Sequence, residues 1–167
     1  FGASKLAADI YCQEYNKYFD LQIGVLRGSC LTGPLHRGAE LHGFLSYLIK
    51  AAKERRKYYI FGYKGKQVRD NIHSEDVVQA CWEFYKTKNN SGAYNIGGGR
   101  SNSCSILEAI DILKKKHDIK LKYQILKKNR SGDHIWYISD NSKFQNQHKN
   151  WKIKRNLNSI ISEIVAN

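Results

Sequence analysis

The chain has 167 residues, 41% hydrophobic and 12% aromatic, which is sufficient for a real apolar core and fits an ordinary globular protein. The net charge of +13 is spread along the whole chain, largely as lysines on or beside amphipathic segments. This distribution of charge predicts solvated helix faces and no nucleic-acid partner. No apolar run is long enough to cross a membrane, so we expect no membrane partner.

The four cysteines are Cys12, Cys30, Cys81 and Cys104, and no two of them have the spacing of a metal-binding motif. Scattered cysteines in a chain of this length are typical of reduced thiols in a cytoplasmic protein. We therefore expect a cytoplasmic location and no metal. The chain opens at Phe1 and contains no methionine, so we also expect a fragment of a longer protein.

Apolar periodicity predicts helices and strands that alternate along the chain. The first half contains a helix over Gly2–Tyr18, a strand over Gln22–Leu26, a glycine-rich loop, a helix over Leu41–Lys53, a strand over Tyr58–Gly62, a turn over Tyr63–Lys66 and an extended segment over Val68–Ile72. The second half contains a helix capped by Ser74, a strand over Ala93–Ile96, a helix capped by Ser103 or Ser105, a strand over Lys120–Leu126, a loop over Lys127–His134, an extended segment over Ile135–Ile138, a short helix over Ser142–Lys149 and a final helix over Leu157–Val165. This alternation predicts an α/β fold with a largely parallel sheet.

The chain starts with the segment Phe1-Gly2-Ala3-Ser4-Lys5. It resembles the Tyr-x-x-x-Lys motif of the short-chain dehydrogenases, whose two side chains lie about one helical turn apart and face the nicotinamide. The resemblance implies that Lys5 binds the cofactor and assists catalysis, because its charge lowers the pKa of a phenol that transfers a proton. Phe1 stands at the tyrosine position and has no hydroxyl, so it cannot transfer that proton.

A second segment has the sequence LRGSCLTGP and begins at Leu26. It resembles the strand-end motif R-x-S-x-x-Y-G-P of the same enzymes, and the ends of strands are where α/β folds place ligands. The resemblance implies that Arg27 and Ser29 lie near the cofactor. Thr32 replaces the tyrosine of the motif and Leu35 replaces an arginine that usually follows it. We expect Arg37 to take the place of that arginine and to bind substrate.

The third segment, GKQVRD, is the most specific of the signals. It resembles the G-x-G-x-Q-x-R-D stretch of extended short-chain dehydrogenases and departs from it at Tyr63, where the motif has its first glycine. A guanidinium is suited to bidentate contact with a diphosphate. The resemblance implies that Gln67 and Arg69 bind the substrate, whereas Asp70 and Asp76 are expected to orient the turn and cap the next helix.

Two later segments complete the pattern. Gly97-Gly98-Gly99 is not a dinucleotide-binding fingerprint, so we expect a structural turn, with Asn95 as a buried polar contact. The segment RSGD resembles a family loop in which the arginine contacts the diphosphate and the acid contacts the ribose. It implies that Arg130 and Asp133 bind substrate. Arg69 and Arg130 are then expected to converge on one pyrophosphate pocket.

These five segments occur in the order of the extended short-chain dehydrogenases/reductases, the NAD-dependent nucleotide-sugar epimerases and dehydratases. The resemblance implies the C-terminal part of a Rossmann-like parallel sheet with a smaller α/β substrate-binding domain, and places the dinucleotide-binding half outside this chain. Residues 1–34 are expected to end the Rossmann core. Residues 35–167 are expected to form mainly the substrate-binding region, with 68–96 returning to the core sheet.

Within this family the wording of the segments is most similar to the CDP-paratose 2-epimerases, which invert a sugar carbon through transient oxidation by NAD. The resemblance implies a nucleotide-diphosphate sugar as the substrate and leaves open a homodimer. The alternatives are a nucleotide-sugar 4-epimerase, a 4,6-dehydratase and a non-catalytic nucleotide-sugar-binding homologue. Phe1 is the residue that favours the last of them. We expect this chain alone to be inactive.

Overall fold

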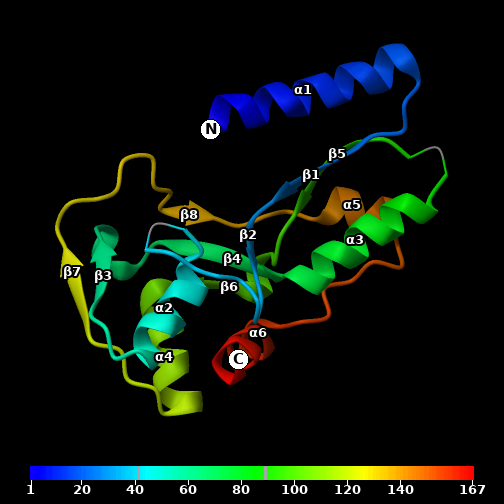
Figure 1. The fold of residues 1–167 in the computed structure, drawn as a ribbon. Coiled ribbons are helices and arrows are strands. Elements are labelled where there is room, and N and C mark those ends of the chain that lie inside the picture. The colour runs from blue at the N-terminus through cyan, green and yellow to red at the C-terminus, as the bar shows by residue number, and fades with distance from the viewer. Residues whose placement is uncertain (41, 89) are drawn as a thin grey trace.

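The computed structural model of the chain describes residues 1–40, 42–88 and 90–167 (Figure 1). It confirms the predicted α/β class, and most of its strand pairs are parallel. The strands form three short sheets that helices cover, rather than one continuous sheet.

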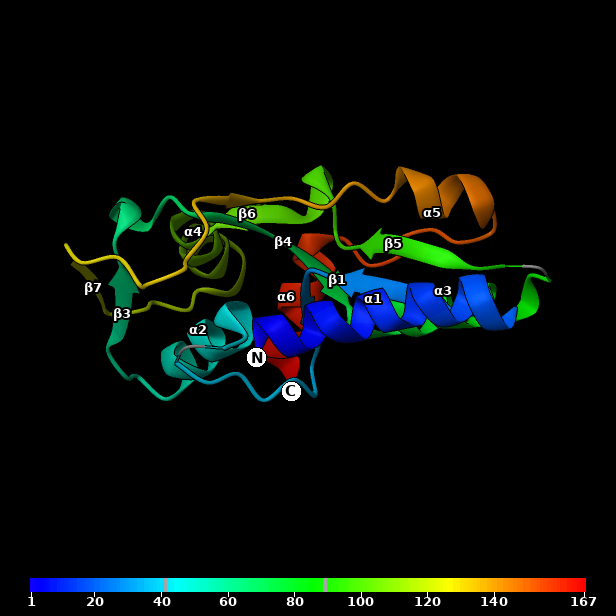
Figure 2. The same ribbon diagram turned by 90° about the horizontal axis from the view of Figure 1, so that it is seen from above.

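The first sheet pairs β1 (Gly24–Gly28) with β5 (Gly92–Ile96) in parallel. Helix α1 (Gly2–Phe19) lies along one side of this pair, and α3 (Ser74–Lys86) lies on the other (Figures 1 and 2). A small apolar core forms where α3 and α5 (Ser142–Gln147) meet β5, and its buried members are Ile72, Ala80, Tyr94, Ile96, Phe144 and Trp151.

The second sheet is built around β4 (Val68–His73). Its second half pairs in parallel with β2 (Cys30–Thr32), and its first half pairs with β6 (Ser103–Ser105) on one side and β8 (Trp136–Tyr137) on the other. The sequence predicted a loop where β2 lies. A strand of this length is too short to show a period of two, so the prediction missed it.

The third sheet pairs β3 (Tyr58–Phe61) with β7 (Tyr123–Leu126) in parallel. Helices α2 (Phe44–Lys53), α4 (Ile106–His117) and α6 (Leu157–Ala166) enclose the larger apolar core beside it. Its fully buried members include Leu48, Ile60, Leu113, Ile160 and Ile161. Two short 3-10 turns, η1 (Tyr63–Gly65) and η2 (Arg100–Asn102), complete the fold.

The predicted helices are present, with small differences at their ends. The helix predicted from Leu41 begins at Phe44, and Leu41 itself lies outside the described residues. The strand predicted over Gln22–Leu26 lies two residues later, because Gly24 is the first residue that pairs with β5.

The structure corrects two predicted helix caps. His73, rather than Ser74, caps α3, because its imidazole Nδ1 accepts a hydrogen bond from the Glu75 amide at 3.1 Å. Asp76 does not cap the helix, since its carboxylate accepts bonds from the backbone amides of Lys154 and Arg155, each at 3.1 Å. Because both carboxylate oxygens are bound to these amides, Asp76 fixes the segment that leads to α6.

The cap predicted for α4 is confirmed at Ser105, whereas Ser103 belongs to β6. The Ser105 side chain accepts from the Glu108 amide, and the Glu108 carboxylate accepts from the Ser105 amide at 2.7 Å. This reciprocal pair is a capping box, which satisfies two amides that the first turn of a helix leaves unpaired.

Helix α1 confirms the predicted helix, but no residue in it is buried. Its apolar side chains are largely exposed, including Leu6, Ile10, Tyr11, Tyr15 and Tyr18. The ion pair between Asp9 and Arg27 ties the helix to β1, with the carboxylate 2.7 Å from the guanidinium. The homodimer that the sequence leaves open remains a prediction.

In the part of the chain that the structure describes, no helix is long and apolar enough to span a membrane. Within the same residues, no group of histidine, cysteine and acidic side chains is arranged to hold a metal ion.

Candidate functional site

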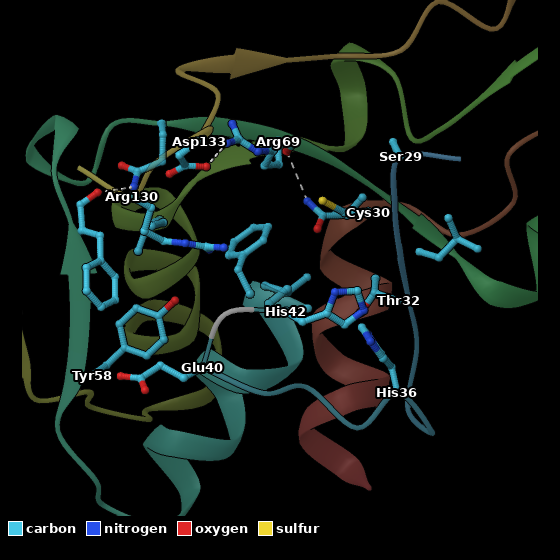
Figure 3. A pocket seen from close by; sticks show the side chains of 18 of the residues that line it. Ser29, Cys30, Thr32, His36, Glu40, His42, Tyr58, Arg69, Arg130 and Asp133 are labelled. Atoms are coloured by element: carbon cyan, nitrogen blue, oxygen red, sulfur yellow. Dashed lines mark hydrogen bonds and ion pairs between the residues drawn. The ribbon is translucent and has the colours of Figure 1, made fainter. Parts of the chain in front are cut away.

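A cavity of about 470 Å³ opens between β2, β3, β4 and the N-terminal end of α2 (Figure 3). The loop that contains Arg130 and Asp133 encloses one side, and His36 and His42 line another, whereas Glu40 lies beside Tyr58. Its wall therefore combines charged, imidazole and aromatic groups from segments far apart in the sequence. The predicted site residues that line it are Ser29, Gln67, Arg69, Arg130 and Asp133.

Arg69 is held in place by the protein. Its Nη2 donates to the Asp133 carboxylate at 2.6 Å and to the His134 carbonyl, and its Nη1 donates to the Val68 carbonyl at 2.7 Å. The side chain is only 15% exposed. Because a guanidinium has five N–H groups, this anchoring leaves donors for a ligand while it fixes the plane of the group.

Arg130 lines the same cavity as Arg69, from the loop before β8. Its charge acts on Tyr58, where it opposes the effect of burial. Burial raises the pKa of Tyr58 to about 12, and nearby Arg130 lowers it in part. The two arginines thus line one cavity, and their binding of a diphosphate stays a prediction.

Asp133 and Gln67 each have one side-chain oxygen that accepts no hydrogen bond from the described residues. The Asp133 carboxylate accepts hydrogen bonds from Arg69 and from the His134 amide, and both fall on Oδ1. Gln67 donates through Nε2 to the Phe61 carbonyl at 3.2 Å, and its buried Oε1 has no partner among the described residues. Buried acceptors without a partner are uncommon in native proteins, so Gln67 offers an unused acceptor at the cavity wall.

The β2 end of the cavity carries Ser29 and Cys30. The Ser29 hydroxyl donates to the Asp70 carbonyl at 3.3 Å. Burial raises the pKa of the Cys30 thiol to about 11, so this thiol stays protonated at neutral pH. It is a neutral wall residue and not a nucleophile.

Three other predicted residues, Lys5, Arg27 and Arg37, do not line the cavity. Lys5 is exposed on α1, with its ammonium 5.5 Å from the centre of the Phe1 ring. Arg27 is paired with Asp9. Arg37 is exposed and does not line the cavity, although its neighbour His36 does. Their roles stay predictions.

Sequence reasoning missed the polar residues of the segment after β2. His36 and His42 lie edge to face, with ring centres 6.0 Å apart, and Glu40 lies between them in the sequence. The presence of two histidines in one glycine-rich loop was a weak signal for a polar wall. Their spacing matches no ligand-binding motif, so the sequence alone did not identify the site.

Asp70 was expected to orient the turn over Tyr63–Lys66, but the hydrogen bonds of its side chain go to two other segments. Its Oδ2 accepts from the amides of Gly99 and Ser139, at 3.0 and 3.1 Å. Gly98 is required here, since a Cβ at this position would lie 2.0 Å from the Asn71 carbonyl oxygen. The expectation of a buried contact at Asn95 is wrong, because alternation along β5 turns Asn95 to the exposed side.

The chain matches the NAD dependent epimerase/dehydratase family over residues 1–97. It therefore belongs to that family. Among curated proteins it is 30% identical to the CDP-paratose 2-epimerase of Salmonella typhi, over 87% of this chain and 45% of that protein. It is 28% identical to a putative UDP-glucose 4-epimerase of Methanocaldococcus jannaschii, over 99% of this chain and 52% of that protein.

Solved structures show the same relationship. The UDP-glucuronic acid 4-epimerase of Bacillus cereus, in complex with UDP-glucuronic acid and NAD, superposes with a TM-score of 0.84 at 28% identity. The match covers 99% of this chain and 51% of that structure. The chain thus spans about half the length of the relatives it matches.

Proposed function

We propose that the whole protein is an NAD-dependent nucleotide-sugar epimerase, similar to the CDP-paratose 2-epimerases, that oxidises a sugar carbon transiently and reduces it again from the other face. The observation that carries the proposal is the placement of Arg69 and Arg130 on one cavity. Two guanidinium groups in a partly enclosed space suit a diphosphate better than any neutral ligand, because charge-assisted hydrogen bonds strengthen as water is excluded.

The rest of the cavity fits the remainder of a nucleotide sugar. Tyr58, Tyr59 and Phe61 supply aromatic surface on one wall, which suits a nucleobase. The second oxygen of Asp133 and the unpartnered Oε1 of Gln67 are acceptors for hydroxyl or amino groups. The ligand that combines these features has a base, a diphosphate and a polyhydroxylated group.

NAD would supply the hydride acceptance and return that an epimerisation needs. In this chain Lys5, Arg27 and Ser29 are the residues proposed to contact it. Lys5 fits this role, since it is exposed on α1 and its ammonium has no ion-pair partner among the described residues. Arg27 fits less directly, because Asp9 already occupies its Nε and Nη2 donors.

The substrate nucleotide and the carbon that is inverted distinguish this proposal from a 4-epimerase and from a 4,6-dehydratase. Incubation of the full-length protein with CDP-, UDP-, GDP- and dTDP-sugars, followed by product analysis, separates them. Inversion at C2 of a CDP-linked sugar supports the proposal, whereas loss of water identifies a dehydratase. Binding without conversion identifies the non-catalytic homologue.

The diphosphate site is tested by Arg69→Gln and Arg130→Gln in the full-length protein. We expect each change to weaken the binding of UDP-glucose or CDP-glucose about 10- to 100-fold, the scale of a lost hydrogen bond to a charged group. Isothermal titration calorimetry at fixed ionic strength measures the effect. Arg100→Gln is the matched control, since Arg100 is exposed in η2, away from the cavity. If Arg69→Gln and Arg130→Gln bind the ligand as tightly as the control does, the proposed diphosphate site is wrong.

A further inference from the structure

One wall of the cavity holds a chain of hydrogen bonds that none of the predicted site residues joins. The Ser46 hydroxyl lies 3.3 Å from the His36 Nδ1 and 3.1 Å from the Thr32 hydroxyl. Thr32 and Ser46 are each only 4% exposed, whereas the imidazole of His36 is half-buried. The buried pair therefore anchors one nitrogen of a ring that remains partly accessible.

The ring of His36 is also fixed by its neighbours. It packs on the backbone of Gly43, where an added Cβ would lie 2.4 Å from the His36 Cε1. Gly43 has a φ of +71°, a conformation that favours glycine and lets the chain turn into α2. His42 meets the ring edge to face at 6.0 Å. These contacts hold the imidazole in one orientation before any ligand arrives.

The second nitrogen of His36, Nε2, makes no hydrogen bond to any of the described residues. Burial, together with His42, lowers the pKa of His36, so the ring is neutral at pH 7. A neutral imidazole has one donor and one acceptor nitrogen, and the bond to Ser46 decides which of them is Nε2. A hydroxyl group satisfies either arrangement, because it both donates and accepts.

An anion is a poorer partner for this nitrogen. Its neutral imidazole has no charge to attract a phosphate, whereas a charged donor strengthens such a hydrogen bond. The two arginines already provide a place for the diphosphate on the other side of the cavity. A neutral hydroxyl therefore fits His36 better than a phosphate oxygen does.

We infer that His36 binds a hydroxyl group of the nucleotide sugar through Nε2, and that Ser46 and Thr32 position its ring. This inference rests on the proposed function and adds a specificity-determining residue to the same site. Hydroxyl groups occur on both the hexose and the ribose of such a ligand, and the experiment distinguishes the two sources.

The test uses two replacements of the same residue in the full-length protein. The amide of His36→Gln reaches the place of Nε2, whereas the amide of His36→Asn reaches only the place of Nδ1. The probes are UDP-glucose, UDP and 2′,3′-dideoxy-UDP, with the cytidine series in parallel. Calorimetry gives each affinity, and the melting temperature of each variant shows that it is folded. His117→Asn, on the surface of α4, is the matched control.

We expect His36→Asn to weaken the binding of UDP-glucose about 3- to 10-fold, the scale of one neutral hydrogen bond. The affinity of His36→Gln should stay near that of the wild type. Ser46→Ala releases the ring and weakens binding by a smaller factor. A loss confined to UDP-glucose assigns the hexose. A loss shared by UDP, but not by the dideoxy nucleotide, assigns the ribose.

Three results would overturn the inference. The first is an unchanged affinity for every probe in His36→Asn. The second is an equal loss for all three probes, which would indicate a phosphate contact or a general disturbance. The third is a wild-type protein that binds none of the nucleotides, and this result alone would also end the proposed function.

Discussion

At the scale of the residue, Phe1 bears most directly on the proposed catalysis. It precedes Lys5 by one helical turn and is 98% exposed, so its ring is accessible but has no proton to transfer. We predict that Phe1→Tyr in the full-length protein raises the turnover of its nucleotide sugar by about 10²- to 10⁴-fold, the usual contribution of a general acid or base. Steady-state kinetics measures the gain.

Phe19→Tyr provides the control for that experiment, because it adds a phenol at the other end of the same helix. It should leave turnover unchanged. If Phe1→Tyr is as slow as the wild type, another group moves the proton, or the protein binds its ligand without converting it.

At the scale of the element, periodicity predicts the helices well, and contacts between distant segments decide what it misses. The helix over Leu157–Val165 and the choice of Ser103 or Ser105 as the cap of α4 could be predicted, because helical spacing and capping are local properties. Strand β2 and the role of Asp76 could not, because both depend on partners from other parts of the chain. Arg69 could be predicted to be a site residue because it lies in a recognisable local motif. His36 could not, because its place on the cavity depends on contacts with other segments.

Asp76 also supports a prediction about stability. Its buried carboxylate accepts from two backbone amides, which join α3 to the segment before α6. Asp76→Asn turns one acceptor into a donor that faces an amide, so we expect a loss of about 1–3 kcal/mol in the free energy of unfolding.

Chemical denaturation of the chain measures that loss, and Asp118→Asn is the control. Asp118 ends α4 with a φ of +50°, which asparagine also accepts, so its replacement should change little. An Asp76→Asn variant as stable as this control would mean that the two amide bonds contribute nothing.

At the scale of the whole molecule, His148 links stability to pH. It packs against Phe84, Tyr94 and Phe144 at the small apolar core beside β5. Burial lowers its pKa despite the nearby carboxylate of Glu83. The folded state therefore resists protonation more than the unfolded state does. Above about pH 6.5 both states are neutral and stability is complete, and it falls as the pH drops below that value because only the unfolded chain takes up the proton.

Unfolding titrations between pH 5 and pH 8 should show this decline in the wild type and a shallower slope in His148→Gln. The readout is the slope, so a general loss of stability in the variant does not obscure it. Identical slopes would show that other groups govern the pH dependence.

The proposed function depends most on where the ligand's phosphates bind, and a crystal structure of the full-length protein with UDP-glucose or CDP-glucose shows this directly. We predict that pyrophosphate oxygens lie within about 3 Å of guanidinium nitrogens of both Arg69 and Arg130. A diphosphate bound outside this cavity, or inside it without contact to either arginine, would contradict the account.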